Sequence, residues 1–455
     1  MEERTLQLGQ DKITSLLIRF SLPAIIGMLA NSLYTIIDRL FVGNIVGADA
    51  IAGMSITMPI SFIIMAFGML IGIGSGALVS IRLGENRPHE AEKILGNAFM
   101  LGAIISVITS AVLLYTLDDL LIQFGASKQI LPYGRQFISI ILWGSFFQFT
   151  SFGLSAIIRS EGNPRMSMMV LLLNAGLNII LDFIFVYWLS MGIKGTAIAT
   201  VISQGASAAW VVYYFTRGNS VLNLRWVNLR LQWPVISGII AIGMAPFFMQ
   251  LAASVINILF NRDLARYGGD SAIAAFGIIS TLVMFIMMPI FGINQGSQPI
   301  IGYNYGAGNY QRVIETLKKA IMGATLIASM GFVLGQAIPH ILIMAFTPDA
   351  RVIEQGTRGM RIFMLLLPIV GFQIVSANFF QAVGKAQKAM VLSLLRQVIL
   401  LIPLLLILPP ILKLDGVWIA APISDLIASV VTWFLLMREV KNLRNRKRGS
   451  LAAIK

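Results

Sequence analysis

The acids that fall inside long apolar stretches are the residues of this sequence best suited to chemistry. Asp38 ends one such stretch, and Asn31, Tyr34 and Asp38 are spaced i, i+3 and i+7, so they share one face of a helix. A charged group is costly to bury in hydrocarbon, and a charge at such a place is therefore a functional candidate. The chemistry that this face predicts is the binding of a proton or a hard cation.

A second polar face follows farther along the chain. Asn174, Asn178 and Asp182 recur every four residues, and Thr200 and Gln204 repeat this spacing in the next apolar stretch. If these faces converge with the first one, they form a buried pocket that holds two carboxylates and few basic groups. Such a pocket would bind cations rather than anions.

The pocket has two chemical uses. Burial and the mutual repulsion of Asp38 and Asp182 favour a bound proton on at least one carboxylate, which describes a proton carrier. The same oxygens suit Na⁺, whose ligands would come from Asp38, Asn178, Asp182 and Thr200. The residue types serve both ions, so the coupling ion stays open between H⁺ and Na⁺.

The acids also have structural alternatives. Asp38 could pair with Arg39 or Arg262 at the membrane surface, and Asp182 could be a hydrogen-bonded packing residue. Asp425 is the third acid that lies inside an apolar stretch. It is equally compatible with a structural ion pair and with a role in ion coupling.

The second half of the chain offers amides and thioethers instead of acids. Asn261 takes the place of Asp38 there, and the region around Leu404, which matches Asp182, has no acid. We therefore expect ion coupling in the first half. Amides and thioethers can adapt to varied substrates, although methionine at helical spacing also serves in packing. The candidate substrate cavity comprises Asn31, Gln204, Asn257, Asn261, Met287, Gln295, Gln373 and Asp425.

Pro23 lies in the same apolar stretch as Asp38. A proline removes a backbone hydrogen bond and permits a kink, which could link cation binding to bending of the helix. A static kink or a helix start explains the residue equally well. Arg159 and Arg396 lie near the inner ends of their stretches, and we expect their side chains to snorkel to the membrane surface.

Twelve apolar stretches must position these residues. The 455-residue chain is 57% hydrophobic and 12% charged, with a mean hydropathy of +0.82, which is typical of a bundle of lipid-facing helices. Each stretch has roughly 20 to 28 residues, enough to cross a hydrocarbon core of about 30 Å. The expected spans are 15–43, 52–81, 94–115, 131–158, 166–188, 194–215, 235–261, 272–302, 316–343, 359–381, 389–411 and 415–437.

Composition excludes several classes of protein. Without cysteine and with 2 histidines, the chain has no disulfides, thiolate metal sites, cysteine nucleophiles or multi-histidine metal centre. It also has no phosphate-binding loop of the type G-x-x-x-x-G-K-[ST], which argues against a membrane enzyme and against a self-contained ATP-driven pump. We expect no cofactor beyond the coupling ion.

The basic residues predict the orientation of the chain in the membrane. With both termini in the cytoplasm, the inner segments hold 24 of the 34 Lys and Arg residues, as the positive-inside rule requires. The net charge of +14 is therefore an orientation signal and an attraction to anionic lipid, and nucleic-acid binding is not expected.

The two halves of the chain resemble one another at an offset of about 223 residues. Pro23 matches Pro246, and Gly84 matches Gly308. An even number of helices in each repeat keeps both halves in the same orientation, which is typical of alternating-access transporters and unlike a channel. The expected organisation is a six-helix lobe over 1–218, a cytoplasmic linker over 219–233, a second six-helix lobe over 234–440 and a basic cytoplasmic tail over 441–455.

Several stretches resemble the multidrug and toxic-compound extrusion (MATE) family of transporters. They are Leu33–Gly43, Gly72–Gly84, Arg159–Pro164 with its partner Gln381–Gly384, Asn178–Asp182 and Gly192–Thr200. The resemblance runs from about residue 10 to residue 440, and its strength comes from the order and duplication of the pieces.

The resemblance implies an all-α integral membrane protein with twelve helices in two pseudo-symmetric lobes arranged as a V. It implies export of mostly cationic or amphiphilic organic compounds through the cell membrane against inward H⁺ or Na⁺, by a protein that works as a monomer. A flippase for lipid-linked oligosaccharides, from the same superfamily, is the alternative.

The resemblance also assigns residues to the cation site. Prokaryotic members with a first-lobe cation site match Tyr34, Asp38, Asn178, Asp182 and Thr200 here, and the proline discussed for them matches Pro23. Other members carry acids in the seventh and eighth helices, where this sequence has Asn261 and no acid that we expect to be buried. A second-lobe cation site is therefore not carried over.

Overall fold

The computed structural model describes the backbone of residues 3–452 and the side chains of residues 4–446, and this part of the chain contains helices but no strand. The first half comprises α1 (Glu3–Gln10), α2 (Ile13–Phe41), α3 (Ala48–Ile56), α4 (Met58–Gly84), α5 (Pro88–Tyr115), α6 (Leu117–Gln123), α7 (Leu131–Trp143), α8 (Ser145–Ser160), α9 (Pro164–Asp182) and α10 (Ile193–Thr216). The second half comprises α11 (Trp233–Gly306), α12 (Tyr310–Ala337), α13 (Pro339–Met344), α14 (Ala350–Phe363), α15 (Leu367–Ala382), α16 (Ala386–Leu394), α17 (Ile402–Leu412) and α18 (Leu414–Ala452). Short π-helical segments cover Val42–Val46, Phe183–Trp188 and Leu395–Leu401, and a 3-10 turn covers Trp226–Leu229.

The expected number of membrane spans is confirmed for the described residues. Nine helices are long and apolar enough to cross a membrane, and two bent pairs, α7–α8 at 55° and α14–α15 at 50°, raise the number to eleven. The long helix α11 provides two spans, because its backbone leaves the helical conformation at Gly269, where φ is +69°. Glycine tolerates such a positive φ, so a sharp reversal fits between the two spans.

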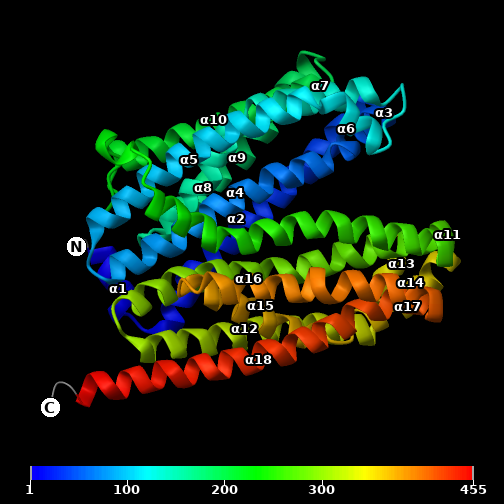
Figure 1. Ribbon diagram of the computed structural model, residues 1–455. Coiled ribbons are helices and arrows are strands. Elements are labelled where there is room, and N and C mark those ends of the chain that lie inside the picture. Colours follow the sequence, from blue (N-terminus) through cyan, green and yellow to red (C-terminus); the bar gives the residue numbers. More distant parts are fainter. Residues whose placement is uncertain (1–2, 453–455) are drawn as a thin grey trace.

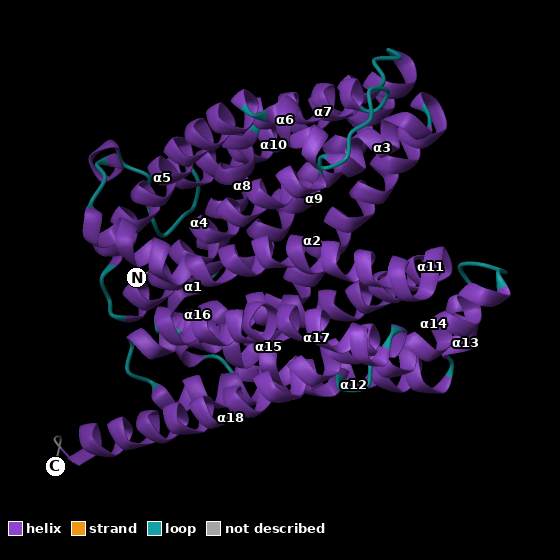
Figure 2. Cartoon of the chain, turned by 45° about the vertical axis from the view of Figure 1, so that its right-hand side comes forward, coloured by secondary structure: helices purple, strands orange, loops and turns teal. Residues whose placement is uncertain are grey.

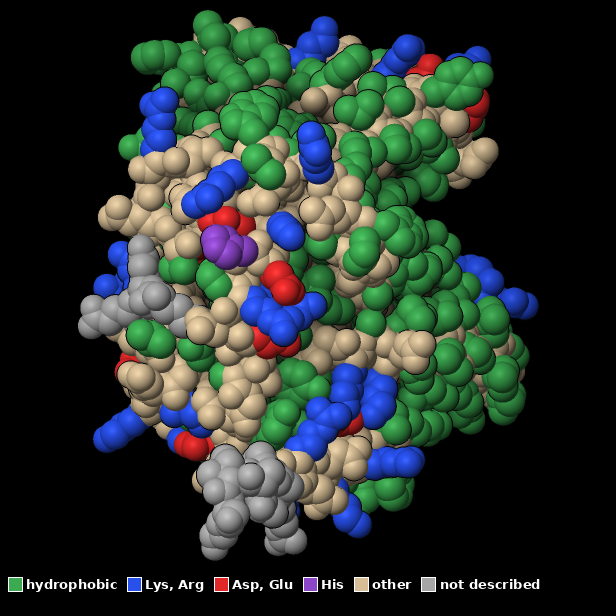
Figure 3. Space-filling model, turned by 60° about the vertical axis from the view of Figure 1, so that its left-hand side comes forward, with side chains coloured by type: hydrophobic (Ala, Val, Ile, Leu, Met, Phe, Trp, Pro, Cys, Tyr) green, Lys and Arg blue, Asp and Glu red, His purple; other side chains and the backbone are tan. Residues whose placement is uncertain are grey.

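The spans form two lobes that separate toward one end of the molecule. Helices α2 to α10 form the first lobe and α11 to α18 form the second, and both termini lie at the end where the lobes meet (Figure 1, Figure 2). The space-filling view shows an indentation between the lobes on one side of the molecule (Figure 3). The lobes join where α4 and α2 pack along α11.

Glycines line the seam between the lobes. A Cβ atom at Gly302 of α11 would come within 2.7 Å of the Ser80 Cβ of α4, and one at Gly84 within 3.0 Å of the Ala307 nitrogen. Gly74 likewise faces the backbone of Ile239. Because these positions have no side chain, the backbones of the two lobes approach closely and close this end of the molecule.

The linker between the lobes is fastened to the first lobe. Asn97 of α5 is fully buried, and its amide donates to the carbonyls of Asn228 (3.4 Å) and Arg230 (3.2 Å) while its oxygen accepts from the Gln232 N–H (2.7 Å). Glu92 accepts from the backbone N–H of Asn223 at 3.1 Å. The linker is therefore a packed strut rather than a free tether.

Both ends of the chain differ from the expected organisation. The segment before the first span, which was expected only to be polar, forms helix α1, and the buried Leu8 anchors it. The carbonyl of Leu8 accepts from Asn304 (2.9 Å) and Arg312 (3.2 Å) of the second lobe. At the other end, α18 continues to Ala452, so the expected tail over 441–455 is helical through its described part, and 453–455 lie outside the described residues.

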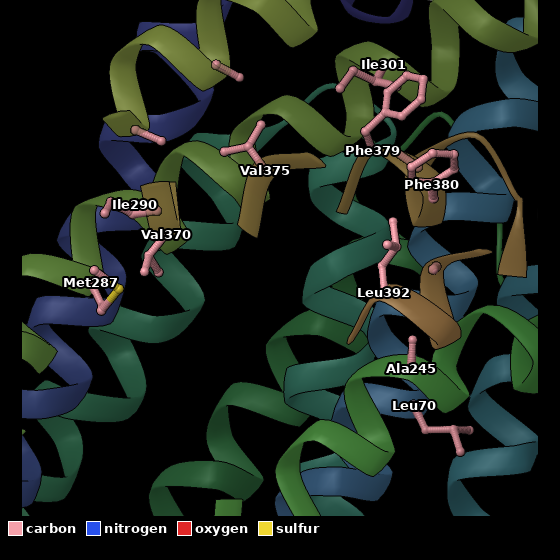
Figure 4. Packing of buried hydrophobic residues seen from close by; sticks show 14 of the residues in the cluster. Leu70, Ala245, Met287, Ile290, Ile301, Val370, Val375, Phe379, Phe380 and Leu392 are labelled. Atoms are coloured by element: carbon pink, nitrogen blue, oxygen red, sulfur yellow. The ribbon is translucent and has the colours of Figure 1, made fainter. Parts of the chain in front are cut away.

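Apolar side chains fill the interior of the second lobe. Phe379 and Phe380 of α15 pack edge to face with their ring centroids 5.4 Å apart, and Leu392 of α16 lies next to this layer (Figure 4). Met287 and Ile290 of α11 lie beside Val370 at another level of the same core (Figure 4). Met287 thus belongs to the packed core, and we do not retain it as a residue of the candidate substrate cavity.

Candidate functional site

The structure brings the two expected carboxylates together inside the first lobe. Asp38 lies near the end of α2 and Asp182 at the end of α9, and these two helices pack against each other. Asp182 is fully buried, Asp38 is 6% exposed, and their side chains interact directly. The convergence of the two polar faces follows from the packing of α2 on α9.

A hydrogen-bond chain orients the neighbouring polar groups. The Asn178 amide donates to the Thr200 hydroxyl at 3.2 Å, and that hydroxyl donates to the Thr196 carbonyl at 3.0 Å. The chain joins α9 to α10, and it consumes the hydroxyl donor of Thr200. The amide oxygen of the buried Asn178 is left facing away from these bonds and without a partner.

Thr196 is a pocket residue that the spacing argument missed. Its side chain is fully buried and lies against Asp38, one helical turn before Thr200. The signal was present in the sequence, because Thr196, Thr200 and Gln204 recur every four residues on one face of α10. Its hydroxyl adds one more oxygen to the pocket.

Unpartnered oxygens define the pocket chemically. Asp38 Oδ1, Asn178 Oδ1, both carboxylate oxygens of Asp182 and Thr196 Oγ1 are buried without a hydrogen-bond partner. Buried polar atoms are nearly always satisfied, and each exception requires an explanation. A cluster made of acceptor oxygens is satisfied by a proton or by a hard cation. No group of three or more His, Cys, Asp or Glu within the described residues could hold a metal ion, so the cation set rests on mixed oxygen ligands.

Three of the remaining first-lobe candidates lie near this cluster or extend its polar lining. Tyr34 is half-buried and interacts electrostatically with Asp38 and Asp182. The buried amide oxygens of Asn174 and Gln204 also lack partners. Asn31, one turn before Tyr34, is exposed on the surface of α2, which suits contact with a substrate rather than with the cation.

The structural alternative for Asp38 is not realised. Within the described residues Asp38 forms no ion pair, because Arg39 reaches toward the sulfur of Met58 (3.8 Å) and Arg262 pairs with Asp263 at 2.9 Å. Asp263 is 3% exposed and one of its oxygens lacks a partner. The expectation that this part of the second half has no buried acid was therefore wrong, because Asp263 turns inward while Arg262 stays at the surface.

Pro23 is buried in the interior of α2, ten residues after the helix begins at Ile13. The alternative of a helix start is therefore wrong. The proline interrupts the backbone hydrogen bonds of α2, the helix that carries Asp38 and that packs along α11 of the second lobe. A weakened point thus lies between the pocket and the seam.

Asp425 is held by an ion pair in the second lobe. The Arg396 guanidinium donates to Asp425 Oδ1 at 2.6 Å, and Ser424 Oγ donates to the carbonyl of Arg396, also at 2.6 Å. The expected snorkelling of Arg396 was wrong, because its guanidinium turns toward the buried carboxylate. Arg159 does not snorkel either and donates to Ser167 Oγ at 2.8 Å.

The amides expected in the second-lobe cavity separate into exposed and buried groups. Asn257 and Asn261 are exposed, and Asn257 donates to a carbonyl of its own helix. Gln295 contacts the sulfur of Met28 across the interface between the lobes, at 3.5 Å. Gln373 is buried and its amide oxygen lacks a partner. These residues do not form one cluster around a common point as the first-lobe oxygens do.

Glu161 is a buried acid that the sequence argument passed over. It follows α8 in a loop, is 1% exposed, and accepts hydrogen bonds from the Tyr214 hydroxyl and from Ser220 Oγ. Burial raises the pKa of its carboxyl from 4.5 to about 7, although these hydrogen bonds oppose the rise.

The protein is expected to lose thermal stability through Glu161 as the pH rises from 5 to 8. The folded state keeps a proton that the unfolded chain releases above pH 4.5, so unfolding becomes more favourable until the pH passes about 7. Glu161→Gln should remove this component, which amounts to at most ~3 kcal/mol. Thermal unfolding of the purified protein at both pH values measures the change, with Glu354→Gln, an exposed acid on α14, as the control. Equal pH dependence in the intact protein and in Glu161→Gln would contradict the assignment.

Comparison with known proteins agrees with this architecture. A model of the MatE family matches residues 23–184 and 246–407, which places one match in each half of the chain at the offset of the internal repeat. The multidrug export protein MepA of Staphylococcus haemolyticus is 30% identical over 450 residues, covering 98% of this chain and 97% of the relative. MepA of Staphylococcus aureus strain MRSA252 is 29% identical over 441 residues, covering 95% and 96% of the two chains.

Solved structures show the same fold. The MATE multidrug transporter DinF-BH, determined in complex with a drug, is 40% identical and superposes with a TM-score of 0.89 over 96% of this chain and 98% of its own. A transporter of the MOP superfamily from Pyrococcus furiosus is 23% identical, with a TM-score of 0.91 over 98% and 99% of the chains, which shows the fold alone. With the two matches of the family model and this fold, the chain belongs to the MatE family of multidrug and toxic-compound extrusion transporters.

Proposed function

We propose that the protein is a secondary active transporter of the cell membrane that exports cationic and amphiphilic organic compounds in exchange for inward movement of H⁺ or Na⁺. The names of the relatives support this proposal, since MepA is a multidrug export protein and DinF-BH is a multidrug transporter with a drug bound in its structure. The coupling site consists of Asp38, Asp182, Asn178, Thr200 and Tyr34. The protein works as a monomer.

The cluster of unpartnered oxygens in the first lobe carries the proposal. Two buried carboxylates lie side by side without a basic partner, and the amide of Asn178 and the hydroxyl of Thr196 add further oxygens without donors. Two adjacent carboxylates cannot both stay ionised in a dry site unless a cation joins them. The occupancy of the pocket by H⁺ or Na⁺ is therefore coupled to its electrostatic free energy.

Movement between the lobes would convert cation binding into transport. The lobes meet at the end that holds the termini and separate at the other end (Figure 1), so the cavity faces outward when the termini are cytoplasmic. Cation binding from outside neutralises Asp38 and Asp182 and weakens the attraction of the pocket for a cationic substrate, which leaves. The loaded pocket then shifts the balance between outward-open and inward-open states by its differential affinity for the two.

The decisive experiment measures ethidium efflux from cells and from proteoliposomes with a pH gradient and a Na⁺ gradient imposed separately. Asp38→Asn and Asp182→Asn are each expected to lower the efflux rate at least about tenfold at normal expression, because the neutral amide no longer attracts a cation. Asp119→Asn, which removes an exposed acid of α6, is the matched control and should transport normally.

The gradient that drives efflux in the intact protein identifies the coupling ion. Normal efflux in both pocket variants would remove this site from the mechanism and direct attention to Asp425. If neither gradient drove efflux of ethidium or of other organic cations by the intact protein, the proposed antiport would be refuted.

A further inference from the structure

A groove on the surface of the first lobe lies outside the cation pocket. It has a volume of about 510 Å³ and lies where α5, α8 and α10 meet. Its floor is formed by Gly205, Ala208, Ala209 and Val212 of α10, spaced i, i+3, i+4 and i+7 on one helical face. Small residues on the floor keep the groove open between the neighbouring helices.

Aromatic rings form the walls of this groove. Phe99 of α5 and Phe146 of α8 pack edge to face with centroids 5.9 Å apart, and Phe146 packs on Phe147 at 5.7 Å. Phe147 is 37% exposed, so its ring faces the surroundings of the lobe rather than a closed core. Rings and small aliphatic groups offer an apolar channel without charge.

The length of the groove matches one leaflet of a bilayer. From Gly205 to Arg217 the lining follows α10 for about three turns, which is roughly 18 Å at 1.5 Å per residue. Half of a hydrocarbon core is about 15 Å thick. An extended acyl chain thus fits along the groove from the membrane surface toward the middle of the bilayer.

The groove ends in polar groups at the side of the termini. Thr216 and Arg217 line this end, and the carbonyl of nearby Asn219 accepts from Arg4 close to the N-terminus. Arg217 is exposed and forms no ion pair with any acid in the described part of the chain. Its guanidinium is therefore available to a phosphate in the head-group layer.

We propose that this groove binds one anionic glycerophospholipid of the cytoplasmic leaflet, with an acyl chain along the aromatic walls and the phosphate on Arg217. The unpaired positive charge repels the cationic compounds proposed as substrates, whereas it complements an anionic head group. The lipid holds α5, α8 and α10 together and stabilises the first lobe, because a ligand that binds only the folded state stabilises that state.

The test compares lipid binding and thermal stability in nanodiscs of phosphatidylglycerol and of phosphatidylcholine, and counts bound lipids by native mass spectrometry. Arg217→Gln is expected to weaken phosphatidylglycerol binding about fivefold. Gly205→Leu should block the groove, because a Cβ there meets only the Phe147 ring, at 3.8 Å. Arg217→Lys retains the charge and should restore binding.

Arg230→Gln is the matched control, since it removes an exposed arginine near the same end of the lobe but outside the groove. It should bind phosphatidylglycerol as the intact protein does. Ethidium efflux by each variant verifies that the protein is folded. Equal losses in Arg217→Gln and Arg230→Gln would show a diffuse surface effect and overturn the proposal. Full binding by Gly205→Leu, or equal protection by inorganic phosphate alone, would overturn it as well.

Discussion

A disulfide between cysteines placed at Ser80 and Gly302 is expected to abolish transport, and its reduction is expected to restore it. Ser80 belongs to α4 of the first lobe and Gly302 to α11 of the second, and a Cβ atom at Gly302 would lie 2.7 Å from that of Ser80. A disulfide requires about 3.5 to 4.5 Å between the Cβ atoms, so a shift of about 1 Å accommodates it. If the inward-open state requires the lobes to part at this seam, the covalent bond holds the protein in one state.

The absence of native cysteine makes this experiment clean. Efflux from proteoliposomes is measured after oxidation and again after reduction, and the loss of free thiols is counted by a maleimide-induced mass shift in the denatured protein. Cysteines at Ala275 and Gly356 are the matched control, because both lie in the second lobe with Cβ atoms 3.3 Å apart. That pair should cross-link without loss of transport. Full transport by the cross-linked Ser80 and Gly302 variant would contradict opening at the seam.

The second large effect is expected at the ion pair of Arg396 and Asp425. Arg396→Gln leaves a carboxylate that is 9% exposed without its partner at 2.6 Å, which costs about 3 kcal/mol of unfolding free energy. Asp425→Asn leaves the charge of Arg396 unpaired and should also destabilise the protein. The double variant Arg396→Gln with Asp425→Asn removes both charges and should recover most of the stability, since the cost arises from the unpaired charge.

Thermal unfolding of the purified variants measures this cycle, and ethidium efflux at a temperature where all variants are folded separates stability from transport. A structural pair predicts that the double variant transports. The opposite result, in which Asp425→Asn is as stable as the intact protein but loses efflux, would assign Asp425 a role in coupling. Since Arg396 already balances the charge of Asp425 in the structure, we expect the structural role.

The sequence by itself determined the class of the protein, the number of spans and the face on which the cation ligands lie. These features are local or follow a simple periodicity. An apolar run long enough to cross a bilayer becomes a helix whatever surrounds it, because every backbone polar group must be bonded within the segment. For the same reason Asn174, Asn178 and Asp182 share one face of α9.

Residues near helix ends were harder to predict, because one residue decides which side chain turns inward. Asp263 is buried whereas its neighbour Arg262 is exposed, and the spacing expected only an exposed amide, Asn261, to matter there. Glu161 is buried in a loop because α10 and the linker supply Tyr214 and Ser220 as donors. No local pattern announces such partners.

Only the tertiary structure decided which distant groups meet. The packing of α2 on α9 placed Asp38 beside Asp182, the approach of α18 gave Asp425 its partner Arg396, and the glycine seam joined Ser80 to Gly302. Each of these contacts joins different helices, and contacts of that kind depend on the relative rotation and depth of two helices. Hydrophobic periodicity constrains that rotation weakly inside a membrane, where lipid is as apolar as the packed interior.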